Sequence, residues 1–438
     1  MNPIRYFARN IKDYLSNSNI HGLKYIVHRK IHWSERLIWL TLCILSWYAC
    51  IVTIISIHQN FVEKPVAITV DTSYLDWRSP FPAVAICSNF NQQAKDYAAA
   101  IFKKYSNGTL SARSYAEQLF LPSRMGYLKR LERLGISSEE YVEIYKQAEP
   151  DCPETFAKCE WNNNPFDCCN EFVTLHTGFG YCQMLNSKHA KSVKSTIDFS
   201  VDRMHKYAKL SLDFTDEYIK SNSDVQIFIL NQVEIPSLLT SSNKILKNID
   251  KIIGVDFNLL EVVNEDGVKN TPYDKRECRF PEENNDVLIY ELYSYDGCIT
   301  DVEVRKMLKI CGCISYSYPY KPGIQVCNMT GMGCISELRR YQTSLNNEAS
   351  DCSPDCEATS INWYMYDYPL EAVTEGTAKA GLRMKMLSTP HMRYQRYVAR
   401  SLLDLLIACS SSIGLFTGAG LLSIVELFIH TLLPSRKS

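Results

Sequence analysis

Two long uncharged segments dominate the pattern of apolar and polar positions, one near each end of the chain. Residues 37–57 are 21 consecutive uncharged positions, and residues 405–425 form a second run of the same length. As an α-helix, 21 residues extend about 31 Å, which matches the hydrocarbon thickness of a bilayer. The first run follows a 36-residue polar head and lacks the cleavage pattern of a signal peptide. We therefore expect transmembrane helices at 37–58 and 402–429; a helix buried in a soluble core is the alternative.

Between the two runs, the pattern predicts a mixed α+β domain. Alternation of β-branched residues predicts strands at 61–74, at 81–87 and along 195–263. Periodic apolar positions predict helices within 91–150, packed on their own domain, and another at 301–313. No internal repeat or low-complexity tract interrupts this part of the chain.

The 17 cysteines divide between the two runs and the segment that separates them. Three lie within the runs (Cys43, Cys50 and Cys409), where a free thiol behaves as a small apolar group. An even number of cysteines confined to one segment predicts a disulfide framework in an oxidising compartment. Zinc is the alternative, but repeated CxxC pairs with nearby histidines are missing. The fourteen candidates are Cys87, Cys152, Cys159, Cys168, Cys169, Cys182, Cys278, Cys298, Cys311, Cys313, Cys327, Cys334, Cys352 and Cys356.

Adjacent cysteines constrain the pairing within that framework. Ordinary disulfides need Cα atoms well over 4 Å apart and suitably directed side chains. Cys168 and Cys169 are therefore expected to bond to different partners.

The distribution of charge indicates how the chain crosses the membrane. The formal net charge is -1, but residues 1–36 carry a balance of +5 and residues 430–438 carry +2. Basic ends on an acidic middle indicate that both termini are cytoplasmic. N-glycosylation triplets begin at Asn107 and Asn328, in the middle segment. We expect a cytoplasmic segment 1–36, an extracellular domain 59–401 and a short cytoplasmic tail 430–438, with no nucleic-acid partner because no Lys/Arg stripe occurs.

The second run carries small and polar residues that a simple anchor does not need. Carboxylates at membrane depth are costly unless they face water, where rings of acids concentrate cations. Close helix packing through the small residues is the alternative interpretation. Steps of three or four from Asp404 give a predicted pore-lining face of Asp404, Ala408, Ser411, Leu415, Gly418, Leu422 and Glu426.

The triplet Gly418-Ala419-Gly420 within this run suggests a mechanism. Two glycines within three residues weaken a helix, and carbonyls freed at membrane depth are tolerated only around a wet cavity. Repeated around a symmetric oligomer, these carbonyls would replace part of the hydration shell of an ion.

An enzyme is not indicated, because no phosphate-binding glycine loop, HExxH or GxSxG occurs. No metal or cofactor site is expected.

Short motifs occur in a fixed order around the two runs. They are Ile20-His21-Gly22, Asp71-Thr72, Phe81-Pro82-Ala83-Val84 up to Cys87, Arg276 to Pro281, Cys311-Gly312-Cys313, Cys352 to Cys356, Ser401 to Leu406, and Gly414-Leu415-Phe416 continuing to Leu422-Ser423 and Glu426. Their order and spacing over nearly the whole chain resemble the degenerin/epithelial sodium channel superfamily, most closely an insect pickpocket-type subunit.

The resemblance implies a homo- or heterotrimer of identical or related subunits in the plasma membrane. Such a trimer conducts Na+ or mixed monovalent cations, is blocked by amiloride, and serves sensory functions through chemical or mechanical gating. The implied ectodomain consists of palm, β-ball, knuckle, finger and thumb. The resemblance also assigns His21 and Gly22 to gating and Gly418, Ala419 and Gly420 to the selectivity filter.

Three departures from the family pattern change these expectations. Gly420 replaces the usual Ser of the filter, which predicts altered selectivity or a modifier role in a heteromer. Val302 replaces a usual thumb cysteine, so at least one family disulfide is missing or rearranged. Ile407 stands where the family usually has a small residue and where a bulky side chain holds the pore open, which predicts raised resting activity.

Other readings of this two-run topology remain open. They are a non-conducting scavenger-type receptor, a non-conducting modulatory channel subunit and an ATP-gated trimeric channel. The polar second run argues against the receptor, and no lysine-based nucleotide site supports the ATP-gated channel.

Overall fold

The computed structural model covers most of the chain. It describes residues 15–16, 18, 20–28, 31–63, 65–73, 77–88, 92–105, 112, 116, 136–147, 149–189, 197–202, 208–221, 225–237, 244–247, 251–284, 289–319, 321, 323–340, 352–367, 380–390, 392–420, 422–423, 425–426 and 429. The predicted tail 430–438 and the glycosylation candidate Asn107 lie outside these residues.

The chain divides into two compact units. The first, which we call the helical unit, comprises Met1–Ile68, Glu265–Arg276 and Arg396–Ser438. The second, which we call the disulfide-rich unit, comprises Thr69–Asn264 and Glu277–Gln395. The ends of the sequence thus join one unit and its middle forms the other.

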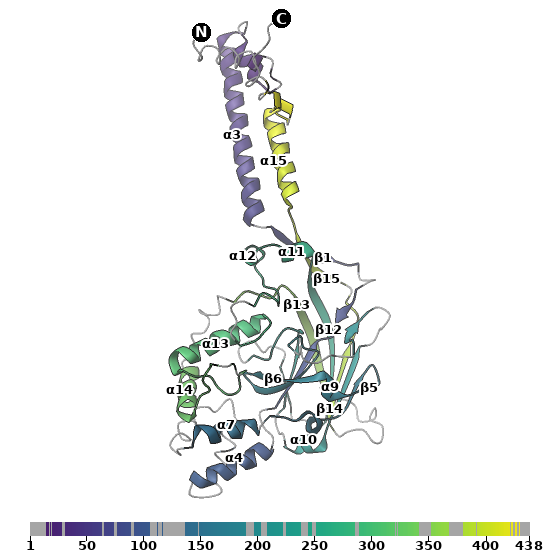
Figure 1. The fold of residues 1–438 in the computed structure, drawn as a ribbon. Helices are drawn as coiled ribbons and strands as arrows, with labels where there is room; N and C mark the ends of the chain where they lie inside the picture. The colour runs from purple at the N-terminus through teal and green to yellow at the C-terminus, as the bar shows by residue number, and fades with distance from the viewer. Residues whose placement is uncertain are drawn as a thin grey trace. The chain divides into compact units, whose positions relative to one another are not determined.

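Two apolar helices form the helical unit. Helix α3 (Trp33–Glu63) has 31 residues and is the one helix among the described residues that is long and apolar enough to cross a membrane. Helix α15 (Leu402–Thr417) is apolar but has only 16 residues. The two lie side by side (Figure 1). Short helices α2 (Leu23–Val27), α11 (Asp266–Lys269) and α12 (Tyr273–Arg276) complete the unit.

An eight-stranded sheet forms one layer of the disulfide-rich unit. Its order is β1-β15-β12-β14-β9-β4-β5, with β13 also paired to β12. The strands are β1 (Val66–Asp71), β4 (Phe156–Trp161), β5 (Asn164–Phe166), β9 (Lys209–Phe214), β12 (Ile252–Asn264), β13 (Ala358–Asp367), β14 (Gly381–Met386) and β15 (Arg393–Val398). Strand β12 pairs with β14 in parallel, whereas β13 pairs with β12 and β9 pairs with β14 in antiparallel fashion. Strands β1 and β15 carry the chain from one unit to the other.

A five-stranded sheet forms the second layer. Its order is β11-β10-β3-β7-β6, and a two-stranded sheet joins β2 (Ser79–Pro80) to β8 (Ser200–Val201). The five strands are β3 (Ala83–Ser88), β6 (Phe172–Thr177), β7 (Gly180–Leu185), β10 (Val225–Leu230) and β11 (Lys244–Lys247). Alternate residues such as Val84 and Ile86 share one buried core with Leu210, Val255 and Leu382 of the larger sheet. The period of two that predicted these strands therefore also defines the core.

Helices cluster around a second core in the same unit (Figure 1). The longer ones are α4 (Gln92–Tyr105), α7 (Ser138–Lys146), α13 (Tyr295–Cys311) and α14 (Met329–Arg340). The shorter helices α8 (Cys152–Thr155), α9 (Cys168–Glu171) and α10 (Asp216–Ser221) pack on the first core instead. Val304 and Met307 of α13 pack with Met332 and Ile335 of α14 because apolar residues recur three or four positions apart.

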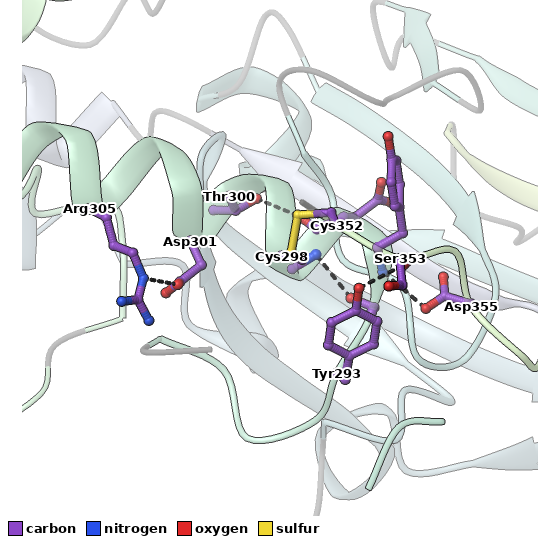
Figure 2. The surroundings of a disulfide bond; sticks show 12 residues. Tyr293, Cys298, Thr300, Asp301, Arg305, Cys352, Ser353 and Asp355 are labelled. Carbon is purple, nitrogen blue, oxygen red and sulfur yellow. Dashed lines mark hydrogen bonds and ion pairs between the residues drawn. A yellow bond between two sulfur atoms is a disulfide. The ribbon is translucent and has the colours of Figure 1, made fainter. Parts of the chain in front are cut away.

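All fourteen predicted framework cysteines form disulfides, which confirms the predicted framework. The pairs are Cys87–Cys182, Cys152–Cys169, Cys159–Cys168, Cys278–Cys356, Cys298–Cys352, Cys311–Cys334 and Cys313–Cys327. Cys168 and Cys169 bond to different partners, as expected. Cys43, Cys50 and Cys409 are free thiols. Figure 2 shows the pair that joins the first turn of α13 to the segment before β13.

Two sequence-based boundaries differ from the structure. The predicted strand at 61–74 starts as helix, because α3 continues to Glu63 and β1 begins only after Pro65, whose ring cannot donate a helix hydrogen bond. The second apolar run is not one uninterrupted helix, because α15 ends at Thr417.

Candidate pore and gating site

Helix α15 begins at a capping box. The Ser401 side chain accepts a hydrogen bond from the Asp404 backbone N–H at 3.2 Å, and the Asp404 carboxylate accepts from the Ser401 N–H at 2.8 Å. Asp404 also accepts from the Ser401 hydroxyl at 2.7 Å. A carboxylate at this position satisfies backbone donors and interacts favourably with the helix dipole. Asp404 therefore has a capping function in addition to its predicted place on a pore face.

A left-handed glycine ends the same helix. Gly418 has φ 67° and ψ 8°, and its N–H donates to the Gly414 carbonyl at 2.9 Å. The Thr417 hydroxyl donates to the Ile413 carbonyl at 2.7 Å and accepts from the Ala419 N–H at 3.1 Å. Only glycine adopts this backbone conformation without a Cβ penalty. The chain therefore leaves the helix at the first position of the glycine triplet.

The helical conformation resumes beyond the triplet. Leu422, Ser423, Val425 and Glu426 are helical. The Gly420 N–H donates to the Ser423 hydroxyl at 3.3 Å, and the Ser423 N–H donates to the Gly420 carbonyl at 3.0 Å. The second apolar run is therefore two helical stretches separated by Gly418-Ala419-Gly420.

This interruption corrects the predicted single pore-lining face. Ala408, Ser411 and Leu415 share α15 with Asp404, but Leu422 and Glu426 belong to the stretch after the break. Counting steps of three or four assumes an unbroken helix, and the left-handed turn at Gly418 invalidates that count. The six residues do not share one continuous helix face.

One side of α15 contacts α3, and another remains open. The Ser46 hydroxyl of α3 donates to the Phe416 carbonyl at 2.6 Å, and the Cys50 thiol approaches the Ser412 carbonyl at 3.9 Å. Ser411 and Leu415 are exposed, with Leu415 at 76%. Of the residues predicted to line a pore, Ser411 and Leu415 therefore lie where α3 does not cover α15.

The N-terminal His-Gly pair contacts the interruption directly. The His21 N–H donates to the Thr417 carbonyl at 2.9 Å. A Cβ atom at Gly418 would lie 2.8 Å from atoms of the His21 ring, so the imidazole occupies the space that a side chain would need. The structure therefore brings together the predicted gating pair and the predicted filter, which are nearly 400 residues apart in sequence.

Glycine at position 22 is needed for this contact. Gly22 has φ 82°, and a Cβ there would lie 2.4 Å from the Cys43 sulfur. Cys43 in turn approaches the His21 carbonyl at 3.6 Å. Tyr25 stacks on Trp39 at a ring-centroid distance of 4.6 Å. These contacts seat the segment from His21 to Tyr25 against α3.

Sequence reasoning missed the part of α3 that receives these contacts. Cys43, Ser46 and Cys50 recur at steps of three and four, so they form a stripe of small residues along α3. All three contact either His21 or the backbone of α15. Their spacing was the available signal, because small residues permit close approach of helices in membranes.

The remaining predicted site residues are placed as follows. Ile407 is 55% exposed on α15. Gly420 has no positive φ, and a Cβ there would meet nothing within 4 Å. Asn328 is exposed immediately before α14. No group of three His, Cys, Asp or Glu residues able to hold a metal occurs among the described residues.

Comparison with known proteins establishes the class of molecule. Residues 14–430 match the family described as amiloride-sensitive sodium channel. The chain therefore belongs to this family of ion channels, which is the superfamily indicated by the motifs. Channels of this family lie in the plasma membrane and assemble from related subunits.

Individual relatives are insect and mammalian channels. Sodium channel protein Nach of Drosophila melanogaster is 21% identical over 99% of this chain and 89% of the relative. Pickpocket protein 28 of the same species is 21% identical over 96% of this chain and 78% of the relative. The bile acid-sensitive ion channel of Mus musculus is 21% identical over 95% and 86%. These relatives confirm an insect pickpocket-type subunit as the fitting subgroup.

Proposed function

We propose that this chain is a pore-forming subunit of a trimeric, amiloride-sensitive plasma-membrane channel for Na+ and other monovalent cations, with chemical or mechanical gating in a sensory role. The supporting observation is the contact of His21 with the end of α15 at Thr417 and Gly418. A cytoplasmic segment that contacts an interrupted apolar helix is of no use to a simple anchor or a receptor.

The length of α15 supports a discontinuous pore helix. Sixteen residues extend about 24 Å, which is short of the roughly 30 Å hydrocarbon core. The glycine triplet and the helical residues after it therefore complete the second crossing. Both termini are then cytoplasmic, and residues 59–401 are extracellular.

The triplet is the proposed selectivity filter. Helix termini leave carbonyl groups without intrahelical partners, and irregular backbone at membrane depth is tolerated where it lines water. Three copies of Gly418, Ala419 and Gly420 around an axis would present these oxygens to a dehydrating cation. Ser411 and Leu415, which α3 leaves uncovered, would line the pore on the extracellular side of the filter.

Two residues would set the properties of this particular pore. Gly420 offers no hydroxyl to the ion, so we expect weaker discrimination between Na+ and K+ than a Ser would give. Ile407 adds bulk on the exposed side of α15, which we expect to raise the resting current.

Voltage clamp of cells that express the chain alone tests the proposal. We expect a current that amiloride blocks and whose reversal potential moves with external Na+. Gly420→Ser should retain the current and shift the reversal potential toward Na+ selectivity, because a side chain at this position meets no neighbour within 4 Å. Gly418→Arg should abolish the current, because its side chain would displace the His21 ring.

Surface biotinylation of the wild type, Gly420→Ser and Gly418→Arg controls for differences in the amount of protein at the cell surface. Gly418→Arg present at the surface without current supports the pore assignment. A wild-type chain that reaches the surface but carries no current, alone or with a related subunit, contradicts it and favours the scavenger-type receptor. A chain that is silent alone but alters the selectivity of a partner is a modulatory subunit.

A further inference from the structure

Three charged side chains lie on neighbouring strands of the large sheet, within the disulfide-rich unit. Asp71 belongs to β1, Arg393 to β15 and Glu261 to β12, and the strand order is β1-β15-β12. Arg393 Nε donates to an Asp71 carboxylate oxygen at 3.3 Å. The guanidinium carbon also lies 4.3 Å from the centre of the Trp77 ring. The arginine is thus held by a carboxylate and an aromatic face together.

The second carboxylate near this arginine is incompletely bonded. Glu261 is 4% exposed, and its Oε2 accepts from the Ser79 hydroxyl at 3.0 Å. Its Oε1 is buried and has no hydrogen-bond partner in the described part of the chain. Burial raises the pKa of Glu261, while the Ser79 hydroxyl and the positive charge of Arg393 lower it. A buried carboxylate oxygen without a donor costs free energy.

A guanidinium has the capacity to serve either carboxylate. It carries five N–H donors in a planar fork, whereas Asp71 takes its bond from Nε. The central strand β15 lies between the two carboxylate-bearing strands. A shift of β15 relative to β1 would lengthen the bond to Asp71 and free guanidinium donors for the carboxylate of Glu261 on the other neighbouring strand.

Strands β1 and β15, which carry Asp71 and Arg393, are placed where such a shift matters. Strand β1 begins three residues after the end of α3, and β15 ends four residues before the start of α15. These strands are therefore the covalent connections of both apolar helices to the disulfide-rich unit. Any rearrangement of the helices during opening is transmitted along the backbone of β1 and β15.

We propose that Arg393 is a gating latch that exchanges between Asp71 and Glu261 as the channel opens and closes. This inference rests on the proposed channel function. In the structure the latch is on Asp71, and the Glu261 oxygen is the vacant position. Asp71 and Glu261 would then stabilise opposite states through one shared arginine.

Current recordings test the exchange with charge-neutralising variants. Asp71→Asn and Glu261→Gln should change the fraction of current that is open at rest in opposite directions, each by about fivefold. When Arg393→Gln is also present, Asp71→Asn and Glu261→Gln should give the same fraction of current at rest. Asp213→Asn is the matched control, because Asp213 pairs with Arg383 on strands β9 and β14 of the same sheet. Changes in the same direction, or a difference that survives Arg393→Gln, would overturn the latch.

Thermal unfolding of the solubilised full chain tests the latch without any current. Double-substitution cycles should give non-additive shifts of Tm for Arg393 with Asp71 and for Arg393 with Glu261. Arg393 with Asp213 should be additive. If neither the wild type nor any variant conducts but Arg393 is non-additive in Tm with both Asp71 and Glu261, the channel proposal fails. The conclusion that the two carboxylates share Arg393 is then kept. Additive behaviour of Arg393 with either carboxylate overturns the latch whatever the currents show.

Discussion

Helices α13 and α15 begin and end in the same way, yet they are held by different means. Ser294 caps the first through a hydrogen bond from the Gly297 N–H, and Ser401 caps the second. Both end at a left-handed glycine, Gly312 with φ 71° and Gly418 with φ 67°. Local sequence therefore gives the two helices the same boundaries by the same chemistry.

The difference lies in what surrounds these ends. The Cys298–Cys352 disulfide bonds the start of α13 to the segment before β13 (Figure 2). The Cys311–Cys334 disulfide bonds its last residue to α14. Helix α15 contains only the free thiol of Cys409 and ends against His21. Covalent bonds hold one helix permanently, whereas hydrogen bonds and ring contact can be exchanged. The exchangeable end is the one that the proposed gating would use.

Alanine at the two terminal glycines should separate these cases most strongly. Both substitutions place a side chain in the left-handed region, at a cost of about 1–2 kcal/mol. Gly312 has nothing within 4 Å of its added Cβ, whereas Gly418 has the His21 ring at 2.8 Å. We expect Gly418→Ala to reduce the current at least about 100-fold and Gly312→Ala to leave it within about twofold, measured by voltage clamp at equal surface expression.

Removal of the ring tests the cause of that loss. His21→Ala keeps the backbone donor to Thr417 but empties the space over Gly418. The double variant His21→Ala/Gly418→Ala should then carry more current than Gly418→Ala alone. His32→Ala is the matched control, because the His32 ring contacts Ser34 and Trp33 instead. Equal currents in the single and double variants would mean that the backbone strain alone causes the loss.

The sequence predicted most of the strands named here and the start of α15, but not the other ends of the two helices. Alternation predicted β3, β9, β10 and β12, and cysteine counting predicted the framework. The helix at 301–313 was predicted too short, because its first turn, from Tyr295, carries few apolar positions. In α15 the weakness at Gly418 was evident, but the length of the pore face was not, since a helical wheel cannot register a left-handed residue.

Contacts between distant segments were not predictable in the same way. The packing of strands and helices determines which cysteines pair. It also determines the hydrogen bond from the His21 N–H to the Thr417 carbonyl. The unbonded oxygen of Glu261 gives no sequence signal, because a buried carboxylate and an exposed one look alike in a strand. The resemblance assigned His21 to gating and Gly418 to the filter separately, and only the fold shows that the two residues are in contact.

Acidity should affect the two helices differently, because α13 starts beside partly buried carboxylates. Asp355 accepts a hydrogen bond from the Tyr295 N–H at 3.0 Å. Burial, with the nearby charge of Glu234 adding to it, raises the pKa of Asp355 to about 7. Burial also raises the pKa of Glu234 to about 7. Between pH 4 and 7 the folded protein therefore binds more protons here than the unfolded chain.

The stability of the disulfide-rich unit should consequently fall as pH rises from about 4 to about 7, and stay constant above that range. Asp355→Asn keeps an acceptor for Tyr295 without the charge. It should raise the unfolding free energy at pH 8 by about 2 kcal/mol and have little effect at pH 4, measured by thermal unfolding. Glu154→Gln, at an exposed carboxylate, is the control and should leave the pH profile unchanged. A profile for Asp355→Asn that parallels the wild type would exclude Asp355 as the titrating group.

The smallest effect should come from the caps themselves. Ser294 is fully buried and Ser401 is exposed, although both accept a hydrogen bond from their helix. Ser294→Ala should cost about 2 kcal/mol and Ser401→Ala about 0.5 kcal/mol, because water replaces the lost acceptor only at the exposed site. Thermal unfolding measures the effect of Ser294→Ala. Surface expression together with current amplitude measures the effect of Ser401→Ala. If Ser401→Ala proves the more damaging, the capping box of α15 has a role in gating beyond helix stability, and the equivalence of the two caps fails.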